Sequence, residues 1–156
     1  MSAHFVFSAA IGSLISWSDG TPRPPERHSK KLAVWKTRNS SGRLIRKADS
    51  RILGSYTAPA SFTLHEGDIG SRGTIVVTIF RTFGVDSTLA FAVIERPPIG
   101  SIRVFDRPGP SHDLIHLAAN REAAEAWLKL HPHPMAVLEE VTADQVAADH
   151  VEGRAA

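Results

Sequence analysis

The sequence predicts an α+β protein, with a mostly antiparallel sheet and two or three helices packed on it. Two observations lead to this fold class. Four short runs rich in β-branched and aromatic residues follow one another between residues 61 and 105, and turn-rich segments separate them. A helical pattern with its own capping residue then follows near residue 120.

The four runs are expected to form a central four-stranded meander. Residues 61–65 alternate between apolar and polar side chains, which is typical of a half-buried strand. Residues 74–80 and 88–94 are apolar on both faces, as in strands that are covered twice, and residues 101–105 supply the fourth strand. Because the connecting segments are short, with residues 67–73 as the first hairpin loop, each strand should pair with the next.

The N-terminal part is expected to contribute a hairpin, a helix and a short strand. Residues 4–8 and 13–17 are aromatic and β-branched, and this composition predicts two paired strands. Apolar or aromatic residues at helical spacing then predict a helix over 25–38, which ends at a turn rich in Asn, Ser and Gly. Residues 42–47 are expected to form a strand or an ordered loop.

The C-terminal part is expected to add two strands and two helices. Residues 114–117 read as a fifth strand, and Asn120 is the expected cap of a helix that runs to about Leu130. Residues 136–141 read as a last strand, and Thr142 begins a short helix with the spacing of a capping box.

The length of 156 residues fits a single domain, residues 1–156, with an alternative in which a basic lobe, 1–57, packs on a sheet-and-helix core, 58–150. The sequence has no cysteine, which excludes thiol nucleophiles, zinc thiolates and disulfides. The apolar stretch 5–17 has no positive charge before it and is too short to cross a bilayer. We therefore expect a cytoplasmic protein with no membrane partner.

Charge is divided unevenly along the chain. Residues 1–57 contain ten Lys and Arg against three Asp and Glu, a net charge of +7, whereas residues 58–156 have a net charge of −5. The near-neutral total of +2 conceals this asymmetry. A basic segment of this kind favours a polyanionic or acidic partner.

The first hypothesis is a small non-enzymatic protein that binds nucleic-acid phosphates, of DNA or RNA, through this basic segment. Arginines bind phosphates in bidentate fashion, lysines act as point charges, and both release counterions from the strand. Trp17 or Trp35, if exposed nearby, would stack on an unpaired base. The candidate nucleic-acid-binding residues are Arg27, Lys30, Lys31, Lys36, Arg38, Arg43, Arg46 and Lys47.

The runner-up is a protein-interaction module, such as an inhibitor or accessory subunit, that uses the same charged surface on an acidic protein. The uneven charge would also allow a homodimer in which the basic part of one copy meets the acidic part of another.

A third hypothesis is a small hydrolase or transferase, which would need loop carboxylates and histidines to converge in one pocket. The candidates for acid–base work are His65, Glu66, Asp68, Glu95, Asp106, His112 and His116. A metal site would need His112 and His116 to converge with Asp113, His131 or His133. No motif identifies a catalytic residue, a metal site or a cofactor, and we expect none of the three.

Overall fold

The computed structural model describes residues 2–71, 74–109 and 112–144, and of residues 68–71 and 74–78 it describes the backbone only. The helices are α1 (Ala3–Ser8), α2 (Ser29–Arg38) and α3 (Arg121–Leu130). The strands are β1 (Leu14–Ser18), β2 (Ser40–Ala48), β3 (Arg51–Leu53), β4 (Tyr56–Ala58), β5 (Ser61–Ser71), β6 (Thr74–Gly84), β7 (Ala90–Glu95), β8 (Ile102–Phe105), β9 (Leu114–Ala118) and β10 (Val137–Glu140). The α+β class and the mostly antiparallel pairing are confirmed, whereas the helix expected from Thr142 lies mainly outside the described residues.

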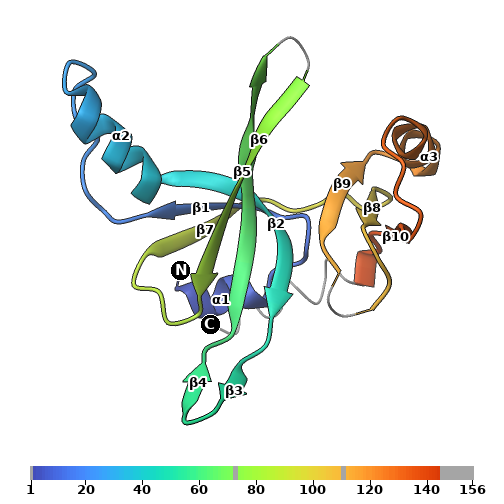
Figure 1. Cartoon of the computed structure of the whole chain (residues 1–156), viewed down its shortest axis with the longest axis horizontal. Helices are drawn as coiled ribbons and strands as arrows, with labels where there is room; N and C mark the ends of the chain where they lie inside the picture. The colour runs from blue at the N-terminus through green and yellow to red at the C-terminus, as the bar shows by residue number, and fades with distance from the viewer. Residues whose placement is uncertain (1, 72–73, 110–111, 145–156) are drawn as a thin grey trace.

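The main sheet has five strands in the order β6–β5–β2–β1–β7, and all its neighbours are antiparallel (Figure 1). The predicted four-stranded meander is therefore wrong beyond its first hairpin, β5–β6. β7 pairs with β1 instead of β6, and β8 belongs to another sheet. Residues 1–57 supply β1 and β2 to the interior of the main sheet, between β7 and β5. The single-domain organisation stays a prediction.

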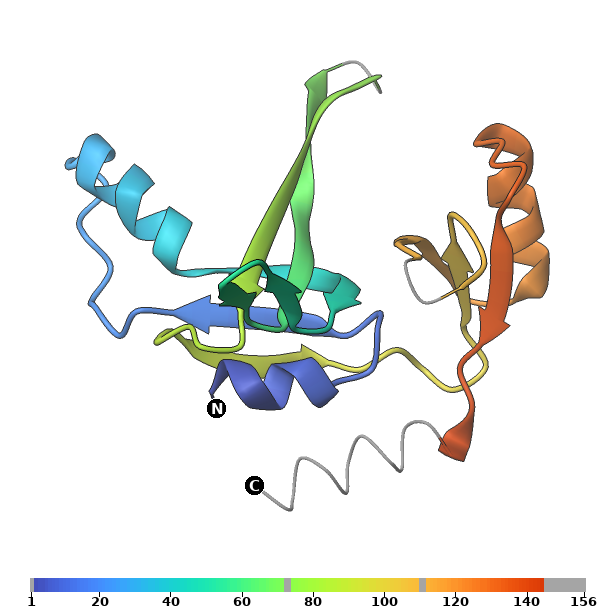
Figure 2. The ribbon, with the colours of Figure 1, turned by 60° about the horizontal axis from the view of Figure 1, so that its bottom comes forward.

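The first predicted hairpin is also wrong, because residues 3–8 form the helix α1 and only 14–18 form a strand. Ala3, Val6 and Ala9 recur every three residues, and all three are buried in the main core. α1 covers the face of the sheet near β7 (Figure 2). Burial of this small-residue stripe thus outweighs the strand preference of the aromatic residues between them.

The main core lies between α1 and the inner face of the sheet. Trp17, Phe62 and Phe91 are buried there, together with Ile15, Leu44 and Leu64. The ring of Phe62 meets that of Phe91 edge-on at 5.4 Å between centroids, a favourable aromatic geometry. Gly42 lets β2 approach β5 closely, since a Cβ at this position would lie 2.9 Å from the backbone oxygen of His65.

The hairpin β5–β6 is longer than predicted, because residues 67–71, part of the expected loop 67–73, continue β5, and β6 extends to Gly84. Its register shifts at Gly67 and Gly70, where β-bulges interrupt the ladder. Residues 51–58, for which no element was predicted, form the small hairpin β3–β4, which points away from the main sheet (Figures 1 and 2).

The second sheet has the order β10–β8–β9 and is covered by α3. The predicted cap is confirmed, because Asn120 Oδ1 accepts a hydrogen bond of 2.8 Å from the amide of Ala123. Buried Ile45 of β2 packs with Phe105 of β8 and Leu114 of β9. This cluster joins the second sheet to the outer face of the main sheet, the face turned away from α1.

Candidate nucleic-acid interface

The eight basic residues predicted to bind nucleic acid fall into two groups. Arg27 precedes α2, and Lys30, Lys31, Lys36 and Arg38 lie on it. All five are exposed. The remaining three, Arg43, Arg46 and Lys47, lie on β2.

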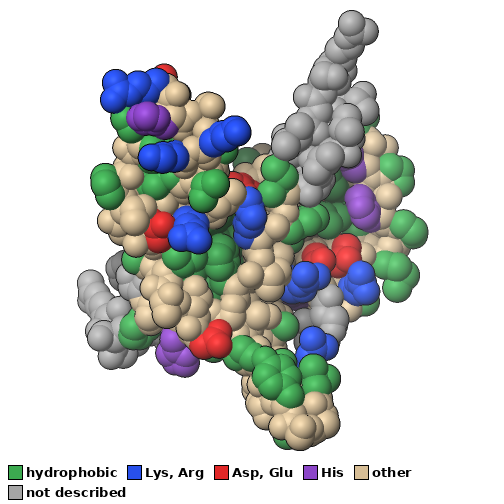
Figure 3. All heavy atoms as spheres, turned by 60° about the vertical axis from the view of Figure 1, so that its left-hand side comes forward, with side chains coloured by type: hydrophobic (Ala, Val, Ile, Leu, Met, Phe, Trp, Pro, Cys, Tyr) green, Lys and Arg blue, Asp and Glu red, His purple; other side chains and the backbone are tan. Residues whose placement is uncertain are grey.

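The α2 group stands apart from the rest of the molecule. α2 extends beyond the end of β1, and basic side chains gather over it at the upper left of Figure 3. The helix begins at Ser29, later than predicted, and buries only Leu32 among its residues. Asn39 secures its end, because the side-chain amide donates to Trp35 O and Asp19 Oδ1 at 2.9 and 3.1 Å.

The β2 group is divided between the two faces of the main sheet. A bulge at Ile45 places Arg43 opposite His65 and Arg46 opposite Thr63, whereas Lys47 pairs with the core residue Phe62. Lys47 accordingly lies over the ring of Phe7 in α1, with Nζ 5.9 Å from the ring centroid. Arg43 and Arg46 therefore share the outer face, and Lys47 does not belong to it.

Two rows of side chains cross this outer face from β2 through β5 to β6. The first row is Arg43, His65 and Phe80, and the second is Arg46, Thr63 and Thr82. The rings of His65 and Phe80 lie 5.6 Å apart, and Phe80 is 54% exposed. In the second row the hydroxyl of Thr63 bonds that of Thr82 at 2.9 Å.

Both arginines are held by neighbouring groups. Arg43 Nη1 donates to the carbonyl oxygen of Gly12 at 2.6 Å. Arg46 Nη1 lies 3.2 Å from Asp113 Oδ2, and its Nη2 donates to Thr63 Oγ1 at 3.4 Å. A guanidinium has five N–H donors, so each arginine keeps donors for a ligand beyond these bonds.

A cavity of about 390 Å³ opens where the outer face meets the second sheet. Arg43, Ile45 and His65 line it from the main sheet. β9 lines it from the other side with residues 114–117, and Trp127 and His131 complete that wall. None of the described residues that line it carries a carboxylate.

Imidazoles surround the indole of Trp127 in this wall. His116, His131 and His133 all lie nearly parallel to it, with ring centroids 4.6, 4.5 and 5.7 Å away. The sequence offered one signal for this cluster, because Trp127 and His131 are four residues apart at the end of a helix. His116, which stacks on Trp127 from β9, has no such spacing to Trp127 in the sequence.

The pKa of His116 is lowered from its ordinary value. Partial burial is the main cause, since it disfavours the charged imidazolium, and the positive charge of His131 adds to it. At neutral pH His116 is therefore an uncharged imidazole, able to donate or accept one hydrogen bond at each nitrogen according to its tautomer.

A second hollow, of about 600 Å³, lies further along β2. Arg46, Lys47 and Arg51 line it with one carboxylate, Asp49, and with the hydroxyls of Thr63 and Thr82. Basic and hydroxyl groups therefore continue from the cavity along β2 toward β3.

One protein family, described as Uncharacterised conserved protein UCP036055, matches residues 1–145 of the chain. The match spans all the strands and helices of the described residues and the lining of both hollows. The chain belongs to this family. The comparisons with curated proteins and with solved structures found no match.

In this family member, the two tryptophans expected to stack on bases have structural roles. Trp17 is only 2% exposed and donates from Nε1 to Thr37 O at 3.2 Å. Trp35 is half-buried and donates to Thr21 O at 3.0 Å. The exposed aromatic ring near the arginines is instead Phe80, at the end of a run expected to be covered on both faces.

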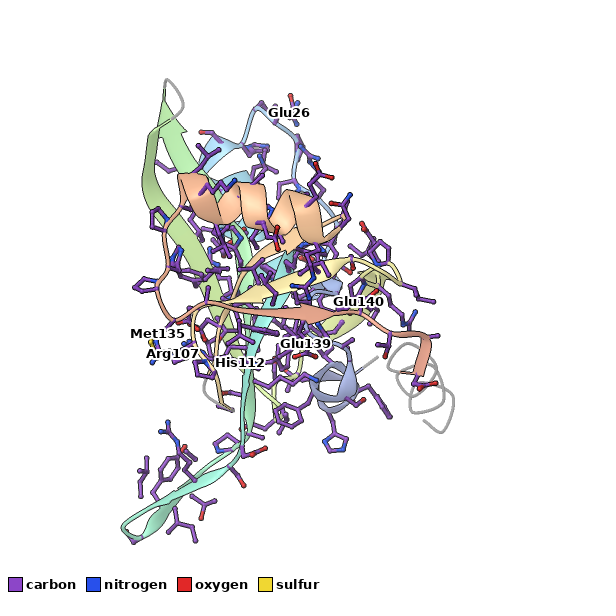
Figure 4. All side chains as sticks on the ribbon, turned by 90° about the vertical axis from the view of Figure 1, so that its right-hand side faces the viewer. Glu26, Arg107, His112, Met135, Glu139 and Glu140 are labelled. Carbon is purple, nitrogen blue, oxygen red and sulfur yellow. The ribbon has the colours of Figure 1, made fainter. Side chains whose placement is uncertain are left out.

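The groups considered for catalysis converge only in part. His65 and His116 line the same cavity, whereas the ring of His112 stacks on Phe105 at 3.7 Å. His112 lies with Arg107 at the end of the second sheet away from α3 (Figure 4). Glu66 pairs with Arg81 at 2.9 Å, and the side chain of Asp68 lies outside the described residues.

No group of three or more His, Asp or Glu within the described part of the chain is arranged to hold a metal ion. The searched part also has no helix with the length and apolar character of a membrane span.

Proposed function

We propose that this protein binds single-stranded nucleic acid along the outer face of β2, β5 and β6. One observation carries the proposal: Arg43 and Arg46 share that face with the exposed ring of Phe80. Proteins that bind single strands combine a positively charged groove, which follows the phosphates, with aromatic rings on which bases stack.

The two rows offer both kinds of contact at strand spacing. Arg43 and Arg46 lie on one strand, and Phe80 lies two strands away in the row of Arg43. The hydroxyls of Thr63 and Thr82 add hydrogen-bonding groups for phosphate or sugar oxygens. The basic hollow beside Arg46 and Arg51 would extend the phosphate path.

The basic residues on and before α2 have a second role in this proposal. Arg27, Lys30, Lys31, Lys36 and Arg38 would attract the strand at a distance and raise its rate of association. The cytoplasmic location and the absence of a cofactor, both expected from the sequence, belong to the same proposal.

Fluorescence anisotropy with labelled single- and double-stranded DNA and RNA tests it, at about 50 mM and about 200 mM salt. We expect single strands to bind more tightly than duplexes, with an affinity that falls steeply with salt. Arg46→Glu should weaken the affinity more than the double change Lys30→Glu and Lys31→Glu. Absence of binding at low salt would overturn the proposal.

The hairpin β3–β4 supports protein interaction as a second candidate function. Ile52, Leu53 and Tyr56 are 79%, 55% and 61% exposed on it, and apolar side chains cover part of this hairpin at the bottom of Figure 3. Arg51 lies at its base. We propose that it contacts the acidic part of a second copy of the chain, residues 58–156, whose net charge is −5.

Sedimentation velocity at low and high salt tests this second candidate. Wild-type protein should associate at low salt, and Ile52→Ser should weaken the association. Val34→Ser is the matched control, since Val34 is 59% exposed on α2, outside both the hairpin and residues 58–156. A monomer at every concentration would rule the second candidate out.

A further inference from the structure

The cavity between the two sheets collects groups that can carry positive charge. Arg43 comes from β2, His65 from β5, His116 from β9 and His131 from the end of α3. We propose that this cavity binds a phosphate monoester on a sugar that also bears a flat base, the chemistry of the phosphorylated end of a nucleic-acid strand. This inference rests on the proposed function and places the phosphorylated end of the bound strand in this cavity.

The electrostatic surroundings favour an anion. His133 adds a further imidazole beside Trp127. The carboxylates of the flanking segments have basic partners, because Asp113 pairs with Arg46 and Glu66 pairs with Arg81. Among the described residues, the wall of the cavity therefore presents one permanent positive charge and three imidazoles, with no carboxylate.

A monoester fits these groups better than the diester inside a strand. A phosphate monoester loses its second proton at a pKa of about 6 and then carries two negative charges, whereas an internal diester carries one. Imidazoles titrate near this value. A dianion next to His116 would favour the imidazolium that partial burial disfavours, so binding is coupled to proton uptake by the cavity.

The cavity also has the size and the apolar wall for a ring. Its volume of about 390 Å³ falls in the range of small-molecule sites. Ile45 and the half-buried Trp127 supply apolar surface beside the polar groups. One phosphorylated nucleotide unit offers the matching combination of an anion and a flat base.

The test compares oligonucleotides of one sequence whose ends carry a 5′-phosphate, a 3′-phosphate or only hydroxyls. Anisotropy with the full chain should show at least a fivefold tighter Kd for one phosphorylated end. This advantage should be larger at about pH 6.5 than at about pH 8, because a bound dianion favours the protonated form of the neighbouring His116. A mononucleoside monophosphate serves as a separate competitor and distinguishes a free nucleotide from a strand end.

Two substitutions test whether the advantage of the phosphorylated end arises in the cavity. His131→Gln changes an exposed residue and should preserve the fold, and His116→Gln changes the half-buried partner. Each should reduce the advantage of the phosphorylated end. His28→Gln removes an exposed imidazole before α2 and should leave the advantage unchanged.

The outcomes separate the two proposals. Equal affinity for phosphorylated and hydroxyl ends would overturn the inference, while the proposed strand binding would stand. Binding of the mononucleotide without binding of any strand would overturn the proposed function and support the cavity as a nucleotide site. An advantage that survives both His131→Gln and His116→Gln would place the phosphate elsewhere and overturn the inference.

Discussion

The imidazole of His116 lies parallel to the indole of Trp127, with their ring centroids 4.6 Å apart and their planes inclined by 4°. This contact joins β9 to α3, and both residues line the cavity between the two sheets. Because Trp127 also stacks with His131, the charge on His116 affects the stability of this wall and, in the proposed site, would affect the binding of an anion.

Stability should rise with pH because the pKa of His116 is lowered in the folded protein. The unfolded chain, with an ordinary imidazole, binds more protons in the window from about pH 6.5 down to the lowered pKa. The free energy of unfolding should therefore increase as the pH rises through that window. His116→Gln should reduce the increase, as measured by urea unfolding at about pH 5.5 and about pH 7.5.

The matched control for this prediction is His28→Gln, which should keep the wild-type pH dependence. An unchanged pH dependence in His116→Gln would show that protonation of His116 does not contribute to it.

Phe80→Ala should weaken the binding of a single strand by roughly tenfold. Stacking of one base on an aromatic ring contributes about 1–3 kcal/mol by alanine substitution. Phe80 is 54% exposed, so its removal should change the free energy of unfolding little. Ile94→Ala, at a similarly exposed site on β7, is the control and should bind as the wild type does. Equal affinities of the two variants would argue against stacking on Phe80.

Arg46→Gln should lower the salt dependence of binding. If Arg46 neutralises one phosphate, its loss should reduce the slope of log K against log salt by about 0.7 for a single strand. The ion pair with Asp113 is partly exposed and contributes at most about 1 kcal/mol, so the fold should persist. Arg23→Gln, which removes another partly exposed arginine, should leave the slope unchanged. Titrations at four or more salt concentrations give both slopes.

Gly42→Ala should destabilise the main sheet by about 1–3 kcal/mol, the usual cost of overpacking. A Cβ at Gly42 would lie 2.9 Å from His65 O and 3.0 Å from Leu64 Cβ, so β2 and β5 would have to separate. Gly67→Ala is the matched control, because a Cβ at Gly67 would meet no neighbouring atom of the described residues within 4 Å. Urea unfolding would contradict this reasoning if the two variants had the same midpoint.

Local signals in the sequence predicted individual elements better than their pairing. The cap at Asn120 and the alternation at 61–65 are interactions between near neighbours in the chain, and both elements are present. β7 instead pairs with β1 across more than seventy intervening residues, and no local pattern encodes that choice. α1 shows the same limit, since only contact with the sheet makes Ala3, Val6 and Ala9 a buried stripe.

The candidate site was predicted by residue type but not by arrangement. The charge count selected Arg43 and Arg46, yet the bulge at Ile45 decides that these two share a face and that Lys47 does not. Two aromatic residues complete the site, Phe80 on that face and Trp127 in the cavity wall. Both are uncharged and lie far along the chain from the two arginines. Only the meeting of the two sheets at Ile45, Phe105 and Leu114 brings the cavity groups together.

The most direct test of the central claim is NMR mapping of the full chain, labelled with ¹⁵N and ¹³C, during titration with a single-stranded oligonucleotide. We expect the largest chemical-shift changes at Arg43, Arg46, Phe80 and the imidazoles of His65 and His116. Shifts confined to α2, or no shifts at low salt, would contradict a nucleic-acid interface on the outer face of β2, β5 and β6.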